Sequence, residues 1–245
     1  MLRRWFLRIL LVAVPLFILA SLWFYLTLPD VSGLLKKNPD ITALIEQRKS
    51  EAAEEGRKIH IVKSWVSFSR IPDMLKKCVR ISEDANFYFH EGIDFDELEE
   101  SLKRNWDEGK IVRGASTITQ QLAKNLYLST DRSIFRKLRE FFIARRLENA
   151  LSKNRIFSLY LNVIEFGPGI FGVEAAAHYY FGKSVTDLSL LEQIRLTAVI
   201  PKPLSVAPTS NSRWMKWRCC WISKKLKLYK YIDETTYESL AAEFC

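Results

Sequence analysis

The feature that most constrains this chain is a long apolar run near its N-terminus. Residues 9–29 contain no charged side chain, and Arg3, Arg4 and Arg8 precede them. In a helix that rises about 1.5 Å per residue, the run extends roughly 31 Å, which is about the thickness of the hydrocarbon core of a bilayer. Since basic residues favour the cytoplasmic side, the sequence predicts one transmembrane helix in the inner (cytoplasmic) membrane, with a cytoplasmic N-terminus and an extracytoplasmic domain.

A cleaved signal peptide is the alternative interpretation of this run. The run is longer than the core of a usual signal peptide, and bulky Trp23, Phe24 and Tyr25 occupy positions where small cleavage-site residues are expected. The sequence therefore favours residues 1–30 as a cytoplasmic N-terminus and an uncleaved anchor. Polar residues 31–58 are expected to form a stalk, and residues 59–245 a single domain.

Charge and cysteine content restrict the chemistry of that domain. The chain has 37 Lys and Arg against 28 Asp and Glu, and the basic excess persists without the three arginines of the anchor. Outside the membrane, such a domain favours anionic partners, and no nucleic-acid-binding motif is recognisable. The cysteines match neither a metal site nor a dense disulfide framework. Cys219 and Cys220 are neighbours, so a bridge, if one forms, is expected from one of them to Cys78 or Cys245.

Helical patterns dominate the domain, and the predicted fold class is mainly α. Residues 59–68 alternate β-branched and aromatic side chains, which predicts one strand or extended piece. Asp94 is expected to cap a helix that ends near Gly109, and Ser133 a longer one. The apolar face of that longer helix contains Ile134, Leu138, Phe142 and Leu147. Further helices are expected at residues 154–161, 172–181, 189–200, 214–227 and 233–244.

A first group of candidate functional residues extends from Glu83 to Asp94. Acids, a histidine and aromatic residues crowd into these twelve positions, a combination suited to a saccharide site. Aromatic faces stack on sugar rings, and a partly desolvated carboxylate gains a pKa high enough for proton transfer. The structural alternative is that Asp84 and Asp94 cap helices and that His90 is a satisfied polar residue.

A second group begins at Ser116, just after Gly114. In a helix that starts here, Ser116, Gln120 and Lys124 lie on one polar face, opposite a face of apolar residues. Free backbone N–H groups at the helix start favour a phosphate or a hydroxyl-rich ligand. A capping role for Ser116 alone would leave the amides and the lysine that follow it without a reason.

A third group is the basic run from Arg132 to Arg139, followed by Glu140. Guanidinium groups bind phosphate oxygens bidentately and an ammonium adds a point charge, so this run could hold a pyrophosphate. Glu140 lies four residues after Arg136 and three after Lys137. The alternative is therefore a ladder of surface ion pairs, each contributing about 0.2–0.5 kcal/mol.

Four long motifs follow one another in the chain. They are EDANFYFHEGID at 83–94, GASTITQQLAKNLYL at 114–128, DRSIFRKLRE at 131–140 and KNRIFSLYLNVIEFGPGIFGVEAAAHYYFGK at 153–183. In this order and spacing they resemble the peptidoglycan glycosyltransferases of glycosyltransferase family 51. The resemblance covers about residues 65–208 and is closest to the stand-alone, monofunctional biosynthetic transglycosylases.

The resemblance implies a lysozyme-like helical domain with a small membrane-associated jaw lobe, and a substrate cleft between them. By motif position, Glu83 resembles the general base that takes the proton of the acceptor 4-hydroxyl. Glu140, the second catalytic candidate, resembles the residue that helps to hold the donor pyrophosphate, directly or through a divalent cation. The positions that match substrate-binding residues of the family are Asp84, Phe87, His90, Gly114, Ser116, Thr117, Gln120, Gln121, Lys124, Asn125, Arg132, Arg136 and Lys137.

The implied activity is polymerisation of lipid II into β-1,4-linked glycan strands with release of polyprenyl pyrophosphate. No cofactor is required, although Glu140 is a candidate ligand of Mg2+ or Mn2+. Expected partners are lipid II, the growing strand, membrane lipid and proteins of cell-wall synthesis or division, but not nucleic acid. An apolar surface near the bilayer is also expected, since the polyprenyl tail stays in the membrane. Ala115 and Ser158 depart from the family's usual glycine and glutamate, so no role is carried over from that acid.

Two rival functions remain for the same motifs. A lytic muramidase would also use a lysozyme-like cleft and a glutamate, but it usually needs a second carboxylate and has no use for a cation cluster. An inactive anchored scaffold would use the cleft only for recruitment, and the intact Glu83 and Glu140 argue against it. Beyond Thr209, including WRCCW at 217–221, the sequence shows no distinctive chemistry.

Overall fold

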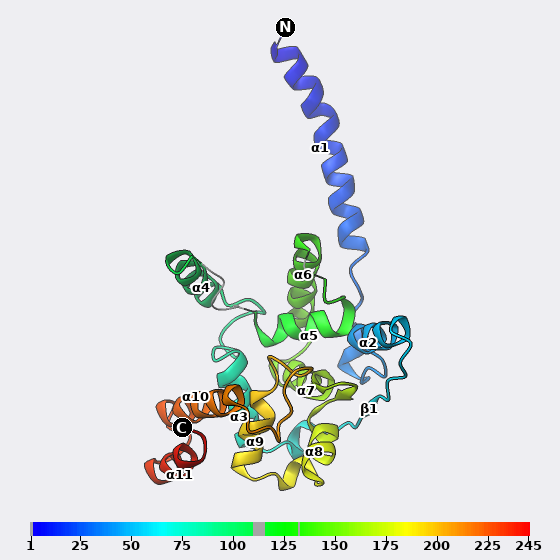
Figure 1. Cartoon of the computed structure of the whole chain (residues 1–245). Coiled ribbons are helices and arrows are strands. Elements are labelled where there is room, and N and C mark those ends of the chain that lie inside the picture. The colour runs from blue at the N-terminus through cyan, green and yellow to red at the C-terminus, as the bar shows by residue number, and fades with distance from the viewer. Residues whose placement is uncertain (1, 110–115, 132) are drawn as a thin grey trace.

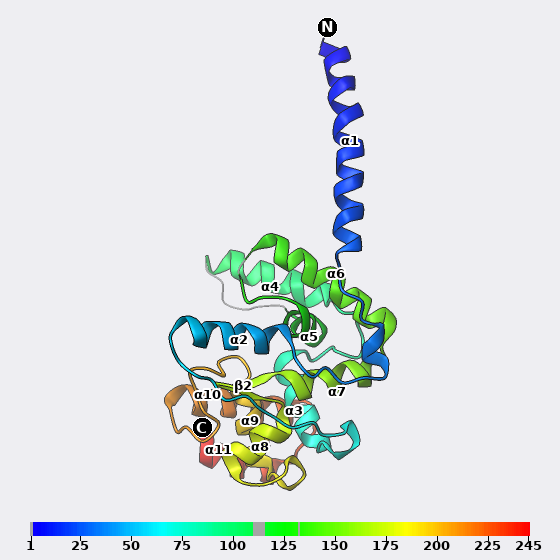
Figure 2. The same ribbon diagram turned by 90° about the vertical axis from the view of Figure 1, so that its right-hand side faces the viewer.

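A long N-terminal helix, α1 (Leu2–Leu26), projects from a body of shorter helices in the computed structural model (Figures 1 and 2). The structure describes residues 2–109, 116–131 and 133–245. From residue 11 to residue 26, nearly every α1 side chain is exposed. Among the described residues, no helix has both the length and the apolar character required to cross a bilayer, so the predicted anchor stays a prediction.

The segment expected to form a stalk lies against the body instead. After η1 (Ser32–Leu35), Thr42 caps α2 (Ala43–Glu54) by accepting a hydrogen bond from the Ile45 N–H, with N···O 3.2 Å. α2 packs on α5, and Arg48 Nη2 lies 2.8 Å from the buried Glu165 carboxylate. A free spacer would have neither contact, so this segment forms part of the body.

A small sheet in the order β1-β3-β2 joins distant parts of the chain. β1 (Val62–Lys63) runs parallel to β3 (Ile170–Phe171), and β2 (Glu165–Gly167) runs antiparallel to β3. Only two residues of the predicted strand pair in this sheet. Just beyond them, the Asn162 side chain accepts from the Val66 N–H at 2.8 Å and donates to the Val66 carbonyl at 3.0 Å. A side chain thus satisfies backbone groups that a longer strand would have paired.

The helical predictions agree closely with the structure. Asp94 accepts a hydrogen bond from the Glu97 N–H and caps its helix, and Ser133 accepts from the Arg136 N–H and caps the longer one. The five later helices match their predicted ranges to within two residues at each end. After η2 (Phe68–Arg70), the helical elements are α3 (Asp73–Glu83), α4 (Phe95–Asp107), α5 (Ile118–Tyr127), α6 (Ile134–Ala150), α7 (Lys153–Val163), α8 (Val173–Phe181), η3 (Val185–Asp187), α9 (Leu190–Ala198), α10 (Arg213–Leu228) and α11 (Glu234–Phe244).

Helix α5 is central to the body, because it packs against α2, α6 and α7. Its predicted apolar face is buried and consists of Ile118, Leu122 and Leu126.

The apolar face predicted for α6 is buried only at Leu147. Ile143 and Ala144 lie in the core with Leu147, whereas Ile134 is 90% exposed and Leu138 is also exposed. Helix α6 thus has apolar residues on two sides, and two of its phenylalanines contact α1. There, the ring of Phe24 lies 5.5 Å from the rings of both Phe135 and Phe142.

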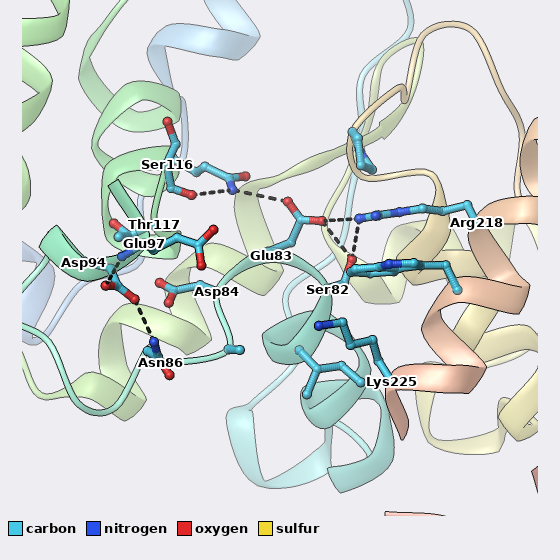
Figure 3. A pocket seen from close by; sticks show the side chains of 15 residues that line it. Ser82, Glu83, Asp84, Asn86, Asp94, Glu97, Ser116, Thr117, Arg218 and Lys225 are labelled. Carbon is cyan, nitrogen blue, oxygen red and sulfur yellow. Dashed lines mark hydrogen bonds and ion pairs between the residues drawn. The ribbon is translucent and has the colours of Figure 1, made fainter. Parts of the chain in front are cut away.

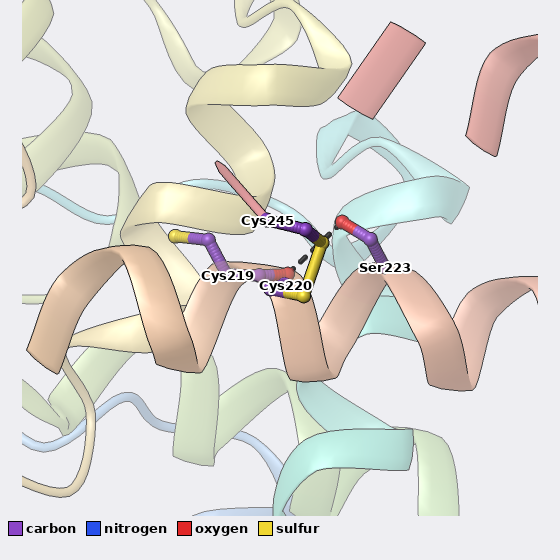
Figure 4. The surroundings of a disulfide bond; sticks show 4 residues. All are labelled: Cys219, Cys220, Ser223 and Cys245. Atoms are coloured by element: carbon purple, nitrogen blue, oxygen red, sulfur yellow. Dashed lines mark hydrogen bonds between the residues drawn. A yellow bond between two sulfur atoms is a disulfide. The ribbon is translucent and has the colours of Figure 1, made fainter. Parts of the chain in front are cut away.

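A disulfide between Cys220 and Cys245 ties α10 to the residue that follows α11 (Figure 4). This is one of the pairings that the sequence left open. Cys219 points away from the bridge, and both Cys219 and Cys78 are buried free thiols. Burial raises the pKa of each free thiol to about 12, so both stay protonated and chemically inert at neutral pH.

Candidate active site

A cleft of about 410 Å³ opens where α3 ends at Glu83 (Figure 3). The cleft is lined by the end of α3 with the residues after it, the start of α4, the start of α5, Pro201 after α9, and α10. In Figure 3, Glu83 lies between Ser116 on one side and Arg218 on the other. The catalytic candidate of the first motif therefore faces the cleft.

Three donors hold the Glu83 carboxylate, which is 10% exposed. Gln121 Nε2 donates to one oxygen at 3.2 Å, while Ser82 Oγ donates to the other at 3.0 Å. Arg218 Nη2 lies 3.3 Å from the same oxygen as Ser82. A carboxylate that is fixed in position, partly accessible and at the edge of a cleft has the geometry of a general base.

Tyr160 orients the amide that contacts Glu83. Its hydroxyl donates to Gln121 Oε1 at 2.9 Å, which turns Gln121 Nε2 toward the carboxylate. Burial raises the pKa of Tyr160 well above its ordinary value, and the charges of Glu83 and Asp84 raise it further. Tyr160 therefore remains a proton donor and fixes the position of this amide.

Asp84 and Asp94 have structural partners, as the capping alternative expected. Asp84 accepts from the Ile118 N–H at 2.9 Å and from His90 Nε2 at 3.0 Å. The other ring nitrogen of His90 accepts from the Gly92 N–H at 3.1 Å. These bonds attach the loop after Glu83 to the start of α5, so His90 is a satisfied polar residue.

Phe87, expected at the substrate, is fully buried. Its ring contacts the rings of Tyr88, His90 and Phe157, and Lys153 Nζ lies 4.5 Å from its centroid. A direct contact between Phe87 and a substrate, as the resemblance implied, is therefore wrong for this structure. The side chain packs in the core beneath the first motif, and none of its surface is accessible.

Thr117, not Ser116, caps α5. Thr117 Oγ1 accepts from the Gln120 N–H at 3.1 Å, and Gln120 Oε1 accepts from the Thr117 N–H at 3.0 Å. This capping box leaves Gln120 buried, and Asn125 is likewise buried outside the lining of the cleft. Ser116, Thr117 and Gln121 do line the cleft.

Glu140 is a buried carboxylate at the centre of an ion cluster whose Lys137 is half exposed, so it is not part of a surface ladder. Its side chain is 3% exposed, Arg136 Nη1 lies 2.6 Å from one oxygen, and Lys137 Nζ pairs with the other. Lys137 Nζ also donates to Ser116 Oγ at 3.1 Å, which connects the cluster to the edge of the cleft.

Lys124 adds a further cation to this cluster. Burial lowers the pKa of Lys124, Glu140 opposes that effect, and Arg136 and Lys137 reinforce it. Three cations around one carboxylate leave a net positive charge beside the cleft, which suits a multiply charged anion. The predicted contacts Gly114 and Arg132 lie outside the described residues.

In the part of the chain that the structure describes, Glu140 is not part of a three-ligand group of the kind that holds a metal ion through protein side chains alone, and the divalent cation expected there stays a prediction. Both Glu140 oxygens already face cations, and within the described residues Glu140 belongs to no group of three metal-ligand side chains. The group that does occur consists of Asp84, His90 and Asp94, and all three side chains are engaged in hydrogen bonds.

Helix α10 supplies a wall of the cleft that the sequence patterns did not predict. Arg218, Trp221 and Lys225 all line the cleft. The guanidinium of Arg218 lies 4.4 Å from the centroid of the Trp221 ring, and Lys225 Nζ lies 5.5 Å from it. A basic–aromatic face at positions i, i+3 and i+7 was the available signal. Burial lowers the pKa of Arg218, and the Glu83 carboxylate opposes that effect.

The chain belongs to the transglycosylase family, whose sequence pattern matches residues 51–227. Among its relatives is the biosynthetic peptidoglycan transglycosylase of Herminiimonas arsenicoxydans, 43% identical over 202 residues that cover 82% of this chain and 86% of that protein. The protein of the same name from Alcanivorax borkumensis is 40% identical over 234 residues, covering 96% of this chain and 91% of that protein. The one from Methylobacillus flagellatus is 42% identical over 203 residues, covering 83% and 87%.

Proposed function

We propose that this protein is a peptidoglycan glycosyltransferase that polymerises lipid II into β-1,4-linked glycan strands during bacterial cell-wall synthesis. The name shared by its relatives supports this activity. The structural observation that carries it is the position of Glu83, in a cleft whose edge is hydrogen-bonded through Ser116 to the cation cluster. A base and an anion-binding group thus lie on the two sides of one reaction site.

In this mechanism, Glu83 takes the proton of the acceptor 4-hydroxyl as that oxygen attacks the anomeric carbon of the donor. The bond from the anomeric carbon to the pyrophosphate breaks on the opposite face, so the configuration inverts. Lys124, Arg136 and Lys137 stabilise the negative charge that develops on the leaving polyprenyl pyrophosphate. At the end of the step, the acceptor proton is on Glu83 and the electron pair of the broken bond is on the phosphate oxygen.

Incubation with two substrates separates this function from a lytic one. Wild-type protein is expected to release polyprenyl pyrophosphate from lipid II and to leave finished glycan intact, because glycan hydrolysis has no use for the ion cluster around Glu140. Glycan length and the release of lipid pyrophosphate are the measurements. Solubilised glycan without polymer would refute the proposal and support a muramidase.

The proposal includes attachment of the protein to the membrane through α1. Apolar side chains of α1 are exposed, and further exposed apolar residues lie on α4 and α6, including Leu102, Trp106 and Ile134. The base of α1 is also held: Arg146 Nη2 donates to the Tyr25 carbonyl at 2.9 Å. Together these surfaces would place the cleft near the polyprenyl tail of the substrate.

A truncation tests this attachment. Deleting residues 1–28 is expected to lower polymerisation on membranes more than in detergent micelles, because micelles deliver substrate without a bilayer. Equal losses in the two systems would contradict membrane docking through this helix.

A further inference from the structure

A second hollow of about 720 Å³ lies along α3 beside the cleft. Ala85 and Asn86 line both, so the two are neighbours. Its other wall is the loop between α10 and α11, two helices that lie at the end of the body away from α1 in both views (Figures 1 and 2). We call it the basic–aromatic groove, defined by Phe68, Lys76, Lys77, Arg80, Tyr229 and Tyr231.

The cations of the groove differ in their engagement. Lys76 Nζ pairs with Asp73 at 2.7 Å, and Arg80 donates to the Ala85 carbonyl at 2.7 Å and to the Tyr231 hydroxyl. Lys77 Nζ lies 4.9 Å from the centroid of the Tyr231 ring. Asp73, which also lines the groove, attracts Lys77 at longer range, but Lys77 has no carboxylate within ion-pair distance in the described part of the chain. Lys77 is therefore available to an incoming anion.

The two tyrosines are held in place by the end of α10. The Tyr231 N–H donates to the Leu226 carbonyl and the Lys230 N–H to the Lys227 carbonyl, both at 2.9 Å, with Lys230 in the left-handed region at φ 57°. This is a Schellman motif, which usually places glycine at the left-handed position. The rings of Tyr229 and Tyr231 stack with their centroids 6.1 Å apart. The groove thus presents two stacked tyrosine rings beside an ammonium that has no close carboxylate partner among the described residues.

Resting on the proposed function, we infer that the basic–aromatic groove binds the carboxylate-bearing peptide substituent of the peptidoglycan unit that reacts at Glu83. A neutral sugar offers no anion to Lys77, whereas an acidic peptide offers carboxylates to the cation and amide groups to the tyrosine rings. Lys77 precedes Glu83 by six helical residues, about 9 Å along α3. That distance suits a substituent carried on the sugar at the catalytic residue.

The test compares lipid II that carries free peptide carboxylates with lipid II whose peptide carboxylates are amidated. Wild-type protein is expected to show a higher kcat/KM for the acidic form. Lys77→Glu is expected to lower the ratio of the two kcat/KM values about tenfold, because its charge repels the carboxylates. Lys216→Glu makes the same charge change at an exposed position of α10 outside the groove, and it should keep the wild-type ratio.

The outcomes separate this inference from the function on which it rests. If the wild type polymerises neither lipid II, the proposed function fails. If it polymerises both equally well and Lys77→Glu leaves the ratio unchanged, the groove assignment is overturned while the function stands. Should Lys77→Glu melt at a lower temperature than wild type, Lys77→Gln decides: a ratio about threefold lower supports the assignment, and an unchanged ratio overturns it.

Discussion

Glu83 and Glu140 are glutamates beside the same reaction site, yet Glu83 is only partly buried whereas Glu140 is buried, and their surroundings differ. Glu83 is 10% exposed and receives two neutral donors and one guanidinium, whose nitrogen is 3.3 Å away. Glu140 is 3% exposed, and a cation contacts each of its oxygens. A carboxylate that reaches the cleft can meet a substrate hydroxyl, whereas one that is covered by two cations can act on a substrate only through the cations that it holds in place.

The largest expected effect is that of Glu83→Gln. The amide keeps the shape of the side chain but cannot accept a proton, and its NH2 group can no longer accept from the donor that faced that oxygen, so kcat should fall by about 10² to 10⁴. The measurement is the rate of glycan formation on lipid II, with the melting temperature as a control for folding. Full activity in a folded Glu83→Gln protein would remove the base from this mechanism.

Glu140→Gln should have a smaller effect on rate and a larger one on stability. Without the charge, Arg136 and Lys137 lose their common partner, so we expect kcat/KM to fall by roughly 10-fold to 100-fold through misplaced cations. The free energy of unfolding should drop by about 1–3 kcal/mol, as when a buried partner is lost. Glu46→Gln, which removes an exposed partner of Lys49, is the matched control and should change neither quantity much. A rate loss greater than that of Glu83→Gln would reverse the comparison.

Arg218→Gln tests the contact between Glu83 and a guanidinium. Because that guanidinium helps to hold the carboxylate in position from 3.3 Å, its loss should lower kcat about tenfold with little change in KM. A general loss of folding would instead lower the melting temperature of the variant. Arg218→Lys, which keeps the charge, should restore kcat at least in part.

The smallest expected effect concerns Lys124 and alkaline pH. Burial lowers the pKa of Lys124 below the ordinary 10.5, so its ammonium loses the proton, and its attraction for pyrophosphate, at a lower pH than an exposed lysine. Lys124→Arg keeps a charge throughout this range. The alkaline limb of the kcat/KM profile should therefore move to higher pH in this variant, with little change near neutrality. An unmoved limb would show that Lys124 does not titrate in that range.

Contacts between residues that are close in the sequence could be predicted from the sequence alone. Asp94 and Ser133 cap their helices through backbone groups three residues away, so the signal and the structure lie in the same short segment. The choice between Ser116 and Thr117 as the cap of α5 could not be predicted, because both residue types cap helices well. Asp84, more than thirty residues earlier, also binds the first N–H of that helix.

By itself, the sequence determined the helices and the candidate base, because periodicity, capping and the motif around Glu83 are local properties. Only the tertiary structure decided which apolar side of α6 is buried, which cysteine pairs with Cys245, and that Arg218 reaches Glu83. Each of these depends on segments far apart in the chain that come together when α10 packs on α3 and α6 packs on α5. Burial and proximity are properties of that packing, and no short stretch of sequence contains them.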